Sequence, residues 1–220
     1  MTERFLHHVR VDFPPDDETA AAARERLRDR FPRHAVRRMT HLGLLVGSAL
    51  DGLSLGPDDA LVYASTFAET RALEDFLASF PTASPQLFQT SIHPSAVQQV
   101  LIGRQQPLAR LWPLAGQPRL VEQALTVAFL EPAARVALVG GEERGTWMLD
   151  HGMASARAFA FAALLTREPA SALGRVHFEP ASHPAAADPA PTIEHFARAL
   201  ADRRPLGWRG VTGTWELAWP

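Results

Sequence analysis

The sequence predicts one three-layer α/β domain built on a mixed β-sheet. The 220 residues are 46% hydrophobic and carry a net charge of −2, a composition typical of a globular chain. Short apolar runs at 60–64 and 135–139 indicate buried strands of the parallel kind, and amphipathic segments separate them. No stretch before the Pro- and Ala-rich segment 181–191 has the composition of a domain linker, so we expect a single domain over 1–220.

In the first half we expect strands at 5–13 and 60–64 and helices at 20–31, 42–50 and 71–80. Alternating apolar residues indicate the first strand, and apolar residues at helical spacing indicate the helices. Pro32 ends the first helix, and Gly52 follows the second. The third helix is expected to bury one apolar side, formed by Leu73, Phe76, Leu77 and Phe80.

In the second half we expect extended segments at 87–92 and 107–114, helices at 95–103, 120–130 and 193–202, and strands at 135–139, 156–165, 175–178 and 213–219. Pro94 suits the first turn of a helix, and Pro132 ends the next one. The spacing of the apolar residues in 156–165 fits either a helix or a strand. We favour a strand because another strand follows it after a turn.

Composition excludes several kinds of chemistry. The chain has no cysteine, which rules out disulfides, zinc–cysteine sites and iron–sulfur clusters. All 22 basic residues are arginine, which rules out a lysine Schiff base and a Walker-type phosphate loop. No His, Asp or Glu pair has a metal-site spacing, so we expect neither metal nor cofactor. The net charge gives no reason to expect nucleic acid, and no apolar run is long enough for a membrane span or signal peptide; we expect a cytoplasmic protein.

Five ordered segments carry a resemblance to a known family: 37–43 (RRMTHLG), 62–70 (VYASTFAET), 91–96 (SIHPSA), 114–117 (LAGQ) and 136–143 (VALVGGEE). Their order and separations resemble the N-terminal half of a β-ketoacyl synthase. They are most similar to the short, synthase-like proteins of the chain-length-factor type, which are encoded beside a full synthase in aryl polyene and xanthomonadin-type pigment pathways. The resemblance implies a thiolase-like three-layer α-β-α half, a single domain of the ketosynthase N-terminal type.

The resemblance also locates the position of the missing nucleophile. In these synthases a cysteine lies at a strand-to-helix turn, where the helix N-terminus favours the thiolate. Counting back from Gly140 and Gly141 places Gly116 at that position, with Gln117 one residue away, and the sequence leaves open which of the two occupies it. Neither supplies a thiol, and the half of a synthase that carries the two catalytic histidines has no counterpart here. We therefore expect no catalytic residues and no condensation by this chain alone.

The resemblance implies a catalytically inactive, chain-length-factor-like subunit that pairs with an active ketosynthase as a heterodimer or heterotetramer. Such a subunit would shape the partner's acyl tunnel in fatty-acid, polyketide or polyene-type biosynthesis. The residues expected at the tunnel or interface are Phe88, Ile92, His93, Leu111 and Trp112. An acidic acyl carrier protein would suit the arginines Arg33, Arg37 and Arg38, although a solvated helix end explains the same cluster.

Two other functions remain open on the sequence. One is a stand-alone synthase-like acyltransferase or hydrolase that uses Ser or His; Ser91, Asp150 and His151 supply the residue types, but no G-x-S-x-G motif surrounds a serine. The other is a homodimeric scaffold that binds acyl groups or carrier protein. His93 fits either an acyl-binding or basic role or a cap on nearby backbone. Glu142 and Glu143 are expected in a strand-end loop that contacts solvent or a partner.

Overall fold

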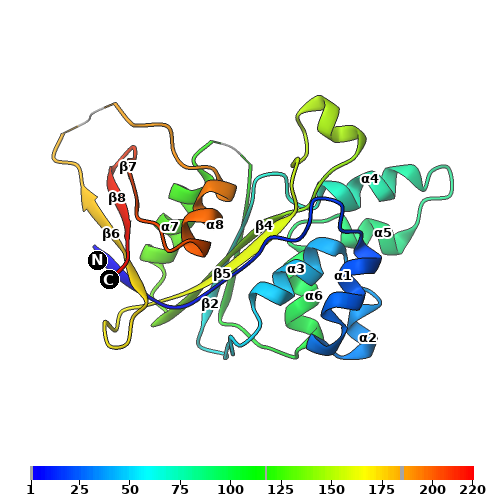
Figure 1. Ribbon diagram of the computed structural model, residues 1–220, viewed down its shortest axis with the longest axis horizontal. Helices are drawn as coiled ribbons and strands as arrows, with labels where there is room; N and C mark the ends of the chain where they lie inside the picture. The colour runs from blue at the N-terminus through cyan, green and yellow to red at the C-terminus, as the bar shows by residue number, and fades with distance from the viewer. Residues whose placement is uncertain (1, 117, 184–185) are drawn as a thin grey trace.

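The computed structural model describes residues 2–116, 118–183 and 186–220. Eight strands form one sheet in the order β3-β2-β4-β5-β1-β6-β8-β7 (Figure 1). They are β1 (Glu3–Asp12), β2 (Ala60–Ser65), β3 (Arg110–Ala115), β4 (Arg135–Glu142), β5 (Phe159–Thr166), β6 (Gly174–Pro180), β7 (Leu206–Arg209) and β8 (Gly213–Ala218). β2 runs parallel to β3 and β4, and the other neighbouring pairs are antiparallel. The predicted mixed sheet is confirmed.

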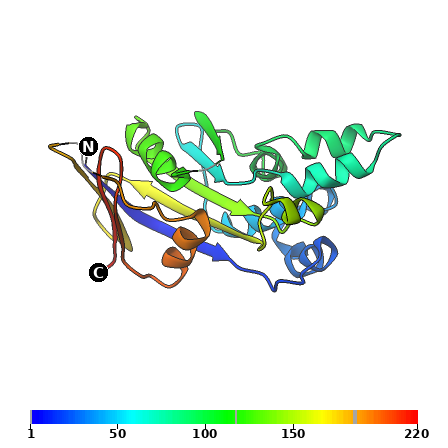
Figure 2. The ribbon, with the colours of Figure 1, turned by 90° about the horizontal axis from the view of Figure 1, so that it is seen from above.

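Helices cover both faces of this sheet, which confirms the predicted three layers (Figures 1 and 2). α7 (Leu120–Leu130) and α8 (Ile193–Ala201) lie on one face. α1 (Ala20–Leu27), α2 (Arg33–Val36), α3 (His41–Ala49) and α6 (Ser95–Gly103) form the layer on the other face. No helix of the described residues is long and apolar enough to cross a membrane.

The alternation of side chains along β2 divides the core in two. Val62 and Ala64 pack toward α7 and α8, whereas Leu61 and Tyr63 pack toward α3 and α6. All six residues of β2 are buried, because both faces of a central parallel strand are covered by helices. The apolar run that predicted a buried strand therefore has its expected place beside the other central strands.

The N-terminal strand β1 connects the strands from the middle of the chain to the strands from its last part. β1 lies between β5 and β6, so the last part of the chain extends the same sheet. Arg4 of β1 is fully buried, and its guanidinium donates hydrogen bonds to the carbonyl oxygens of Glu131 (2.6 Å) and Ala133 (3.4 Å). These bonds connect the end of α7 to the centre of the sheet.

The structure differs from the sequence predictions in several details, and α2 was not expected. Residues 87–92 are not extended: most of them lie in α5 (Pro85–Thr90), which begins where the Ser84 hydroxyl accepts the Leu87 N–H. α4 (Thr70–Ala78) buries Ala72 and Glu74, and Leu77 and Phe80 are exposed, because α4 packs mainly on α5 in an arm that projects beyond the sheet (Figure 2). The short strand β7, which begins just after Pro205, was not predicted.

Candidate functional site

The turn expected to carry the nucleophile position follows β3. Gly116 comes directly after the last residue of that strand, and its N–H donates to the Ser65 carbonyl oxygen (3.4 Å). Its φ of +106° is a conformation that favours glycine, and a Cβ atom there would meet no heavy atom within 4 Å. Gln117, the other candidate, lies outside the described residues. The turn thus connects β3 to α7 as expected and has open space beside Gly116.

Three of the expected interface residues lie together on the α4–α5 arm and the turn that follows it. Phe88 on α5 is 50% exposed, and Ile92 after it is 49% exposed. Phe88 also packs against Phe76 of α4, with ring centroids 5.3 Å apart. Large apolar side chains that are exposed side by side are typical of interaction surfaces. Together with Leu77 and Phe80 of the same arm, Phe88 and Ile92 are exposed apolar side chains of this part of the molecule.

His93 lies deeper than these two residues. Its Nδ1 is 2.9 Å from Glu69 Oε2, and its ring stacks on Tyr63 with centroids 5.0 Å apart. Glu69 is buried and also accepts the Ala96 N–H at the start of α6. His93 Nε2 and Tyr63 Oη are buried without a hydrogen-bond partner among the described atoms. The carboxylate fixes the ring, so His93 contributes to packing below the arm and not to its exposed surface.

The other two expected interface residues lie on opposite faces of β3, the edge strand of the sheet. Leu111 is half-buried and packs on the α3–α6 core. Trp112 is 42% exposed, and its indole N–H donates to Glu131 Oε2 at 2.8 Å. Alternate residues of a strand point to opposite faces, so the two side chains do not form one continuous lining.

A buried carboxylate holds the turn between β2 and α4. Glu142, at the end of β4, accepts the Ser65 hydroxyl (3.0 Å), the Phe67 N–H (3.2 Å) and the Thr66 N–H. Burial raises the pKa of Glu142 to about 7, although the hydrogen bonds from Thr66, Phe67 and Ser65 act to lower it. The expectation that Glu142 lies in a strand-end loop in contact with solvent or a partner is wrong: Glu142 is the last residue of β4, and it is buried because its carboxylate accepts these hydrogen bonds from the neighbouring turn.

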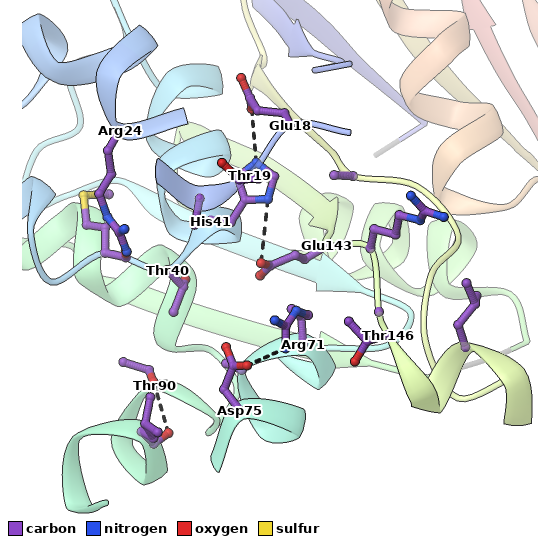
Figure 3. A pocket seen from close by; sticks show the side chains of 18 of the residues that line it. Glu18, Thr19, Arg24, Thr40, His41, Arg71, Asp75, Thr90, Glu143 and Thr146 are labelled. Atoms are coloured by element: carbon purple, nitrogen blue, oxygen red, sulfur yellow. Dashed lines mark hydrogen bonds and ion pairs between the residues drawn. The ribbon is translucent and has the colours of Figure 1, made fainter. Parts of the chain in front are cut away.

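A polar cleft of about 730 Å³ lies beside this turn, between α1, the start of α3 and the α4–α5 arm (Figure 3). His41 lies at its floor between two carboxylates: Nε2 is 3.1 Å from Glu18 Oε2, and Nδ1 is 3.7 Å from Glu143 Oε1. Glu143 also accepts the Leu42 N–H (3.3 Å), and burial raises the pKa of Glu143 to about 7. Glu143 is thus also more buried than the sequence suggested, since it caps α3.

The lining of the cleft is mixed. It carries arginines, threonines and acids from several elements: Arg24, Arg37, Arg38, Arg71, Arg144, Thr19, Thr40, Thr90, Thr146, Asp16, Asp17, Glu18, Asp75, Glu143 and Asp150. Apolar side chains, among them Met39, Leu87 and Leu149, line it as well. Within the described ranges, no group of three or more His, Cys, Asp or Glu side chains has an arrangement that could hold a metal ion.

The serine-based alternative gains no support from the contacts in the described part of the chain. The Ser91 hydroxyl donates to the Phe88 carbonyl oxygen (2.8 Å). Asp150 and His151 belong to the 3₁₀ helix η2 (Trp147–His151), where the His151 ring packs against Trp147. A nucleophile and its base must lie within hydrogen-bonding reach, and no contact joins Ser91 to His151 there.

Five acids around the cleft and the turn between β2 and α4 could not be recognised as a group from the sequence. Glu18, Glu69, Glu74, Glu142 and Glu143 come from distant parts of the chain, and each accepts a hydrogen bond from backbone or from a cationic or histidine side chain. Glu74, for example, accepts the N–H groups of Thr146 and Met148. One signal was present: Glu142 and Glu143 follow a buried apolar run after only two glycines, Gly140 and Gly141.

No protein-family model and no curated protein sequence matches this chain. Several solved structures resemble it, among them these two. The first is a ketosynthase in complex with its chain length factor from Xenorhabdus doucetiae, with a TM-score of 0.68 and 18% identity over 99% of each chain. The second is the ishigamide ketosynthase/chain length factor, with a TM-score of 0.56 and 12% identity over 82% of this chain and 68% of that one. The chain therefore has the thiolase-like fold of the ketosynthase type, as the sequence predicted.

Proposed function

We propose that this chain is a chain-length-factor-like subunit that pairs with an active ketosynthase and shapes its acyl tunnel without forming or breaking bonds. The main support is the structural match that covers 99% of this chain and 99% of a chain from a ketosynthase and chain length factor complex. The matched chain is thus about as long as this one. The chain would act as one ketosynthase-type domain, in the cytoplasm, in an aryl polyene, polyketide or fatty-acid-type pathway.

The absence of a thiol supports a non-catalytic role. The sequence contains no cysteine, and Gly116 lies in the strand-to-helix turn where the resemblance places the nucleophile. The acids beside His41 in the cleft already have partners. Glu18 contacts Arg26 and His41, and Glu143 accepts the Leu42 N–H. The condensing thiolate would belong to the partner.

The exposed apolar residues support a partner. Phe88 and Ile92 on the arm and Trp112 on the edge strand are each between two-fifths and one-half exposed. Aromatic side chains are enriched at protein interfaces, especially where part of the ring is already supported. In this role bulky side chains at the interface would limit the length of the partner's acyl chain. A filled pocket discriminates by about 1–3 kcal/mol per methylene.

An acyl carrier protein is a further proposed partner. Arg37 and Arg38 are exposed at the mouth of the polar cleft, and neither forms an ion pair with a described residue. The side chain of Arg33, the third arginine of the predicted group, lies outside what the structure describes. Six acids line the same cleft, so the support comes from these two exposed arginines and not from the charge of the cleft as a whole. Unpaired surface cations increase the association rate of an acidic partner at low salt.

Co-expression with the neighbouring ketosynthase tests the pairing. We expect the tagged chain and the ketosynthase to elute as one peak in size exclusion. Phe88→Glu should separate them into two peaks, because a carboxylate would be buried at the interface without a partner. Ile102→Glu is the matched control: Ile102 is also exposed but lies at the far end of α6, and the complex should survive. Separate elution of the wild-type proteins would refute the proposed function.

A further inference from the structure

We infer that Glu131 is a positioning residue that fixes the Trp112 indole on the exposed edge strand for contact with the ketosynthase. The identity of the partner in this inference rests on the proposed function. The geometry does not, because all the residues concerned belong to this chain.

Glu131 is almost fully buried directly after α7, yet its carboxylate reaches two side chains of β3. Its Oε2 accepts the indole N–H of Trp112 at 2.8 Å. Its Oε1 accepts from Arg110 at 2.9 Å (Nε) and 2.6 Å (Nη2). Arg110 and Trp112 are two residues apart and therefore point to the same face of the strand. One buried carboxylate thus holds two neighbouring side chains of this face.

The carboxylate itself is rigidly held. Its Oε1 also accepts the Ala133 N–H (3.1 Å), and buried Arg4 donates to the Glu131 carbonyl oxygen (2.6 Å). Burial acts to raise the pKa of Glu131, but the hydrogen bonds from Arg110, Trp112 and Ala133 outweigh it, so the pKa is lowered and the group is ionised at neutral pH. A charged acceptor makes the stronger kind of hydrogen bond.

The hydrogen bond to Glu131 orders the exposed side chain of Trp112. Its indole N–H is a donor only, and with that donor bound to Glu131 the ring has one orientation while 42% of the residue remains exposed. β3 has no neighbouring strand on its outer side within the described sheet. A partner that contacts this edge meets an aromatic ring that is already ordered, and so avoids the entropic cost of ordering it. A mobile indole at the same position would bind more weakly.

A double-mutant cycle tests the inference, with the affinity of the purified chain for the ketosynthase as its first readout. We expect Glu131→Ala and Trp112→Phe each to weaken binding about tenfold, because each removes the same hydrogen bond. The double variant should bind no more weakly than either single variant. Glu131→Gln should stay within about threefold of wild type, since its amide oxygen can still accept the indole N–H. Trp219→Phe is the matched control: it removes another indole hydrogen bond, to the Arg204 carbonyl oxygen (3.1 Å), just after β8 in the part of the sheet far from β3, and it should bind like wild type.

The second readout uses the chain without a partner. The Trp112 indole N–H should exchange slowly with solvent in wild type and in Glu131→Gln, and rapidly in Glu131→Ala, measured by NMR on variants whose thermal unfolding shows a folded state. Additive losses in the double variant, or an equal loss in Glu131→Gln and Glu131→Ala, would overturn the inference. If wild type binds no ketosynthase, the proposed function fails and the docking role fails with it, while slow exchange would still establish the hydrogen bond.

Discussion

Replacing Glu142 with alanine is expected to lower the free energy of unfolding by about 3 kcal/mol. The substitution leaves the Thr66 and Phe67 N–H groups and the Ser65 hydroxyl without their acceptor, and each buried donor without a partner costs about 1–3 kcal/mol. Removal of a buried carboxyl offsets part of this cost. Chemical denaturation followed by circular dichroism measures the difference.

Glu142→Gln and Glu216→Ala test whether the loss of stability comes from the missing acceptor. Glu142→Gln should be destabilised by a smaller amount, because the amide keeps one acceptor oxygen but turns an NH₂ group toward a donor. Glu216→Ala is the matched control, a glutamate in β8 that is exposed, and it should change stability by less than about 0.5 kcal/mol. If Glu142→Ala is as stable as Glu216→Ala, the carboxylate does not hold the turn between β2 and α4.

Replacing Glu143 with glutamine is expected to change how stability depends on pH. Burial raises the pKa of Glu143 from 4.5 to about 7, so the folded state binds this proton more tightly than the unfolded state does. The stabilisation by the proton is fully present below about pH 4.5 and is lost as the pH rises through 7. At pH 8 the buried charge therefore costs the wild type up to about 3 kcal/mol, which the neutral glutamine avoids.

Denaturation curves at pH 5 and pH 8 measure this effect. The difference in stability between Glu143→Gln and wild type should shift in favour of the variant by up to about 3 kcal/mol between the two pH values. Comparison with the variant cancels the similar contribution of Glu142, which both proteins retain. Glu179→Gln, at an exposed position of β6, should follow the wild-type curve at both pH values. A constant difference between Glu143→Gln and wild type would show that Glu143 does not take up its proton near neutral pH.

Much of the fold could be predicted from local patterns. β2 and β4 are continuous apolar runs because helices cover both of their faces, and that signal lies within a few residues of sequence. α5 could not be recognised in the same way. It is six residues long, too short for a helical period to show, and it depends on the Ser84 cap and on packing against α4. The exposure of Leu77 and Phe80 on α4 could not be predicted either, because helical spacing of apolar residues does not show which other element covers them.

The candidate site was predicted less completely than the fold. The turn at Gly116 and the exposure of Phe88 and Trp112 follow from the resemblance and from position beside a strand edge. The acids around His41 could not be predicted, because Glu18 and Glu143 are brought together only when β4 and α1 pack beside the start of α3. For the same reason the bond between Trp112 and Glu131 depends on tertiary structure: residues 19 positions apart meet across the edge of the sheet.

If the reacting thiol belongs to the ketosynthase, as proposed, this chain should never carry an acyl group, and intact mass spectrometry measures this. The purified chain is incubated with an acyl thioester, first alone and then together with the ketosynthase. We expect an unchanged mass for this chain in both reactions and an added acyl group on the ketosynthase only. An acyl group covalently attached to this chain, or elongation of the substrate by this chain alone, would refute the non-catalytic role.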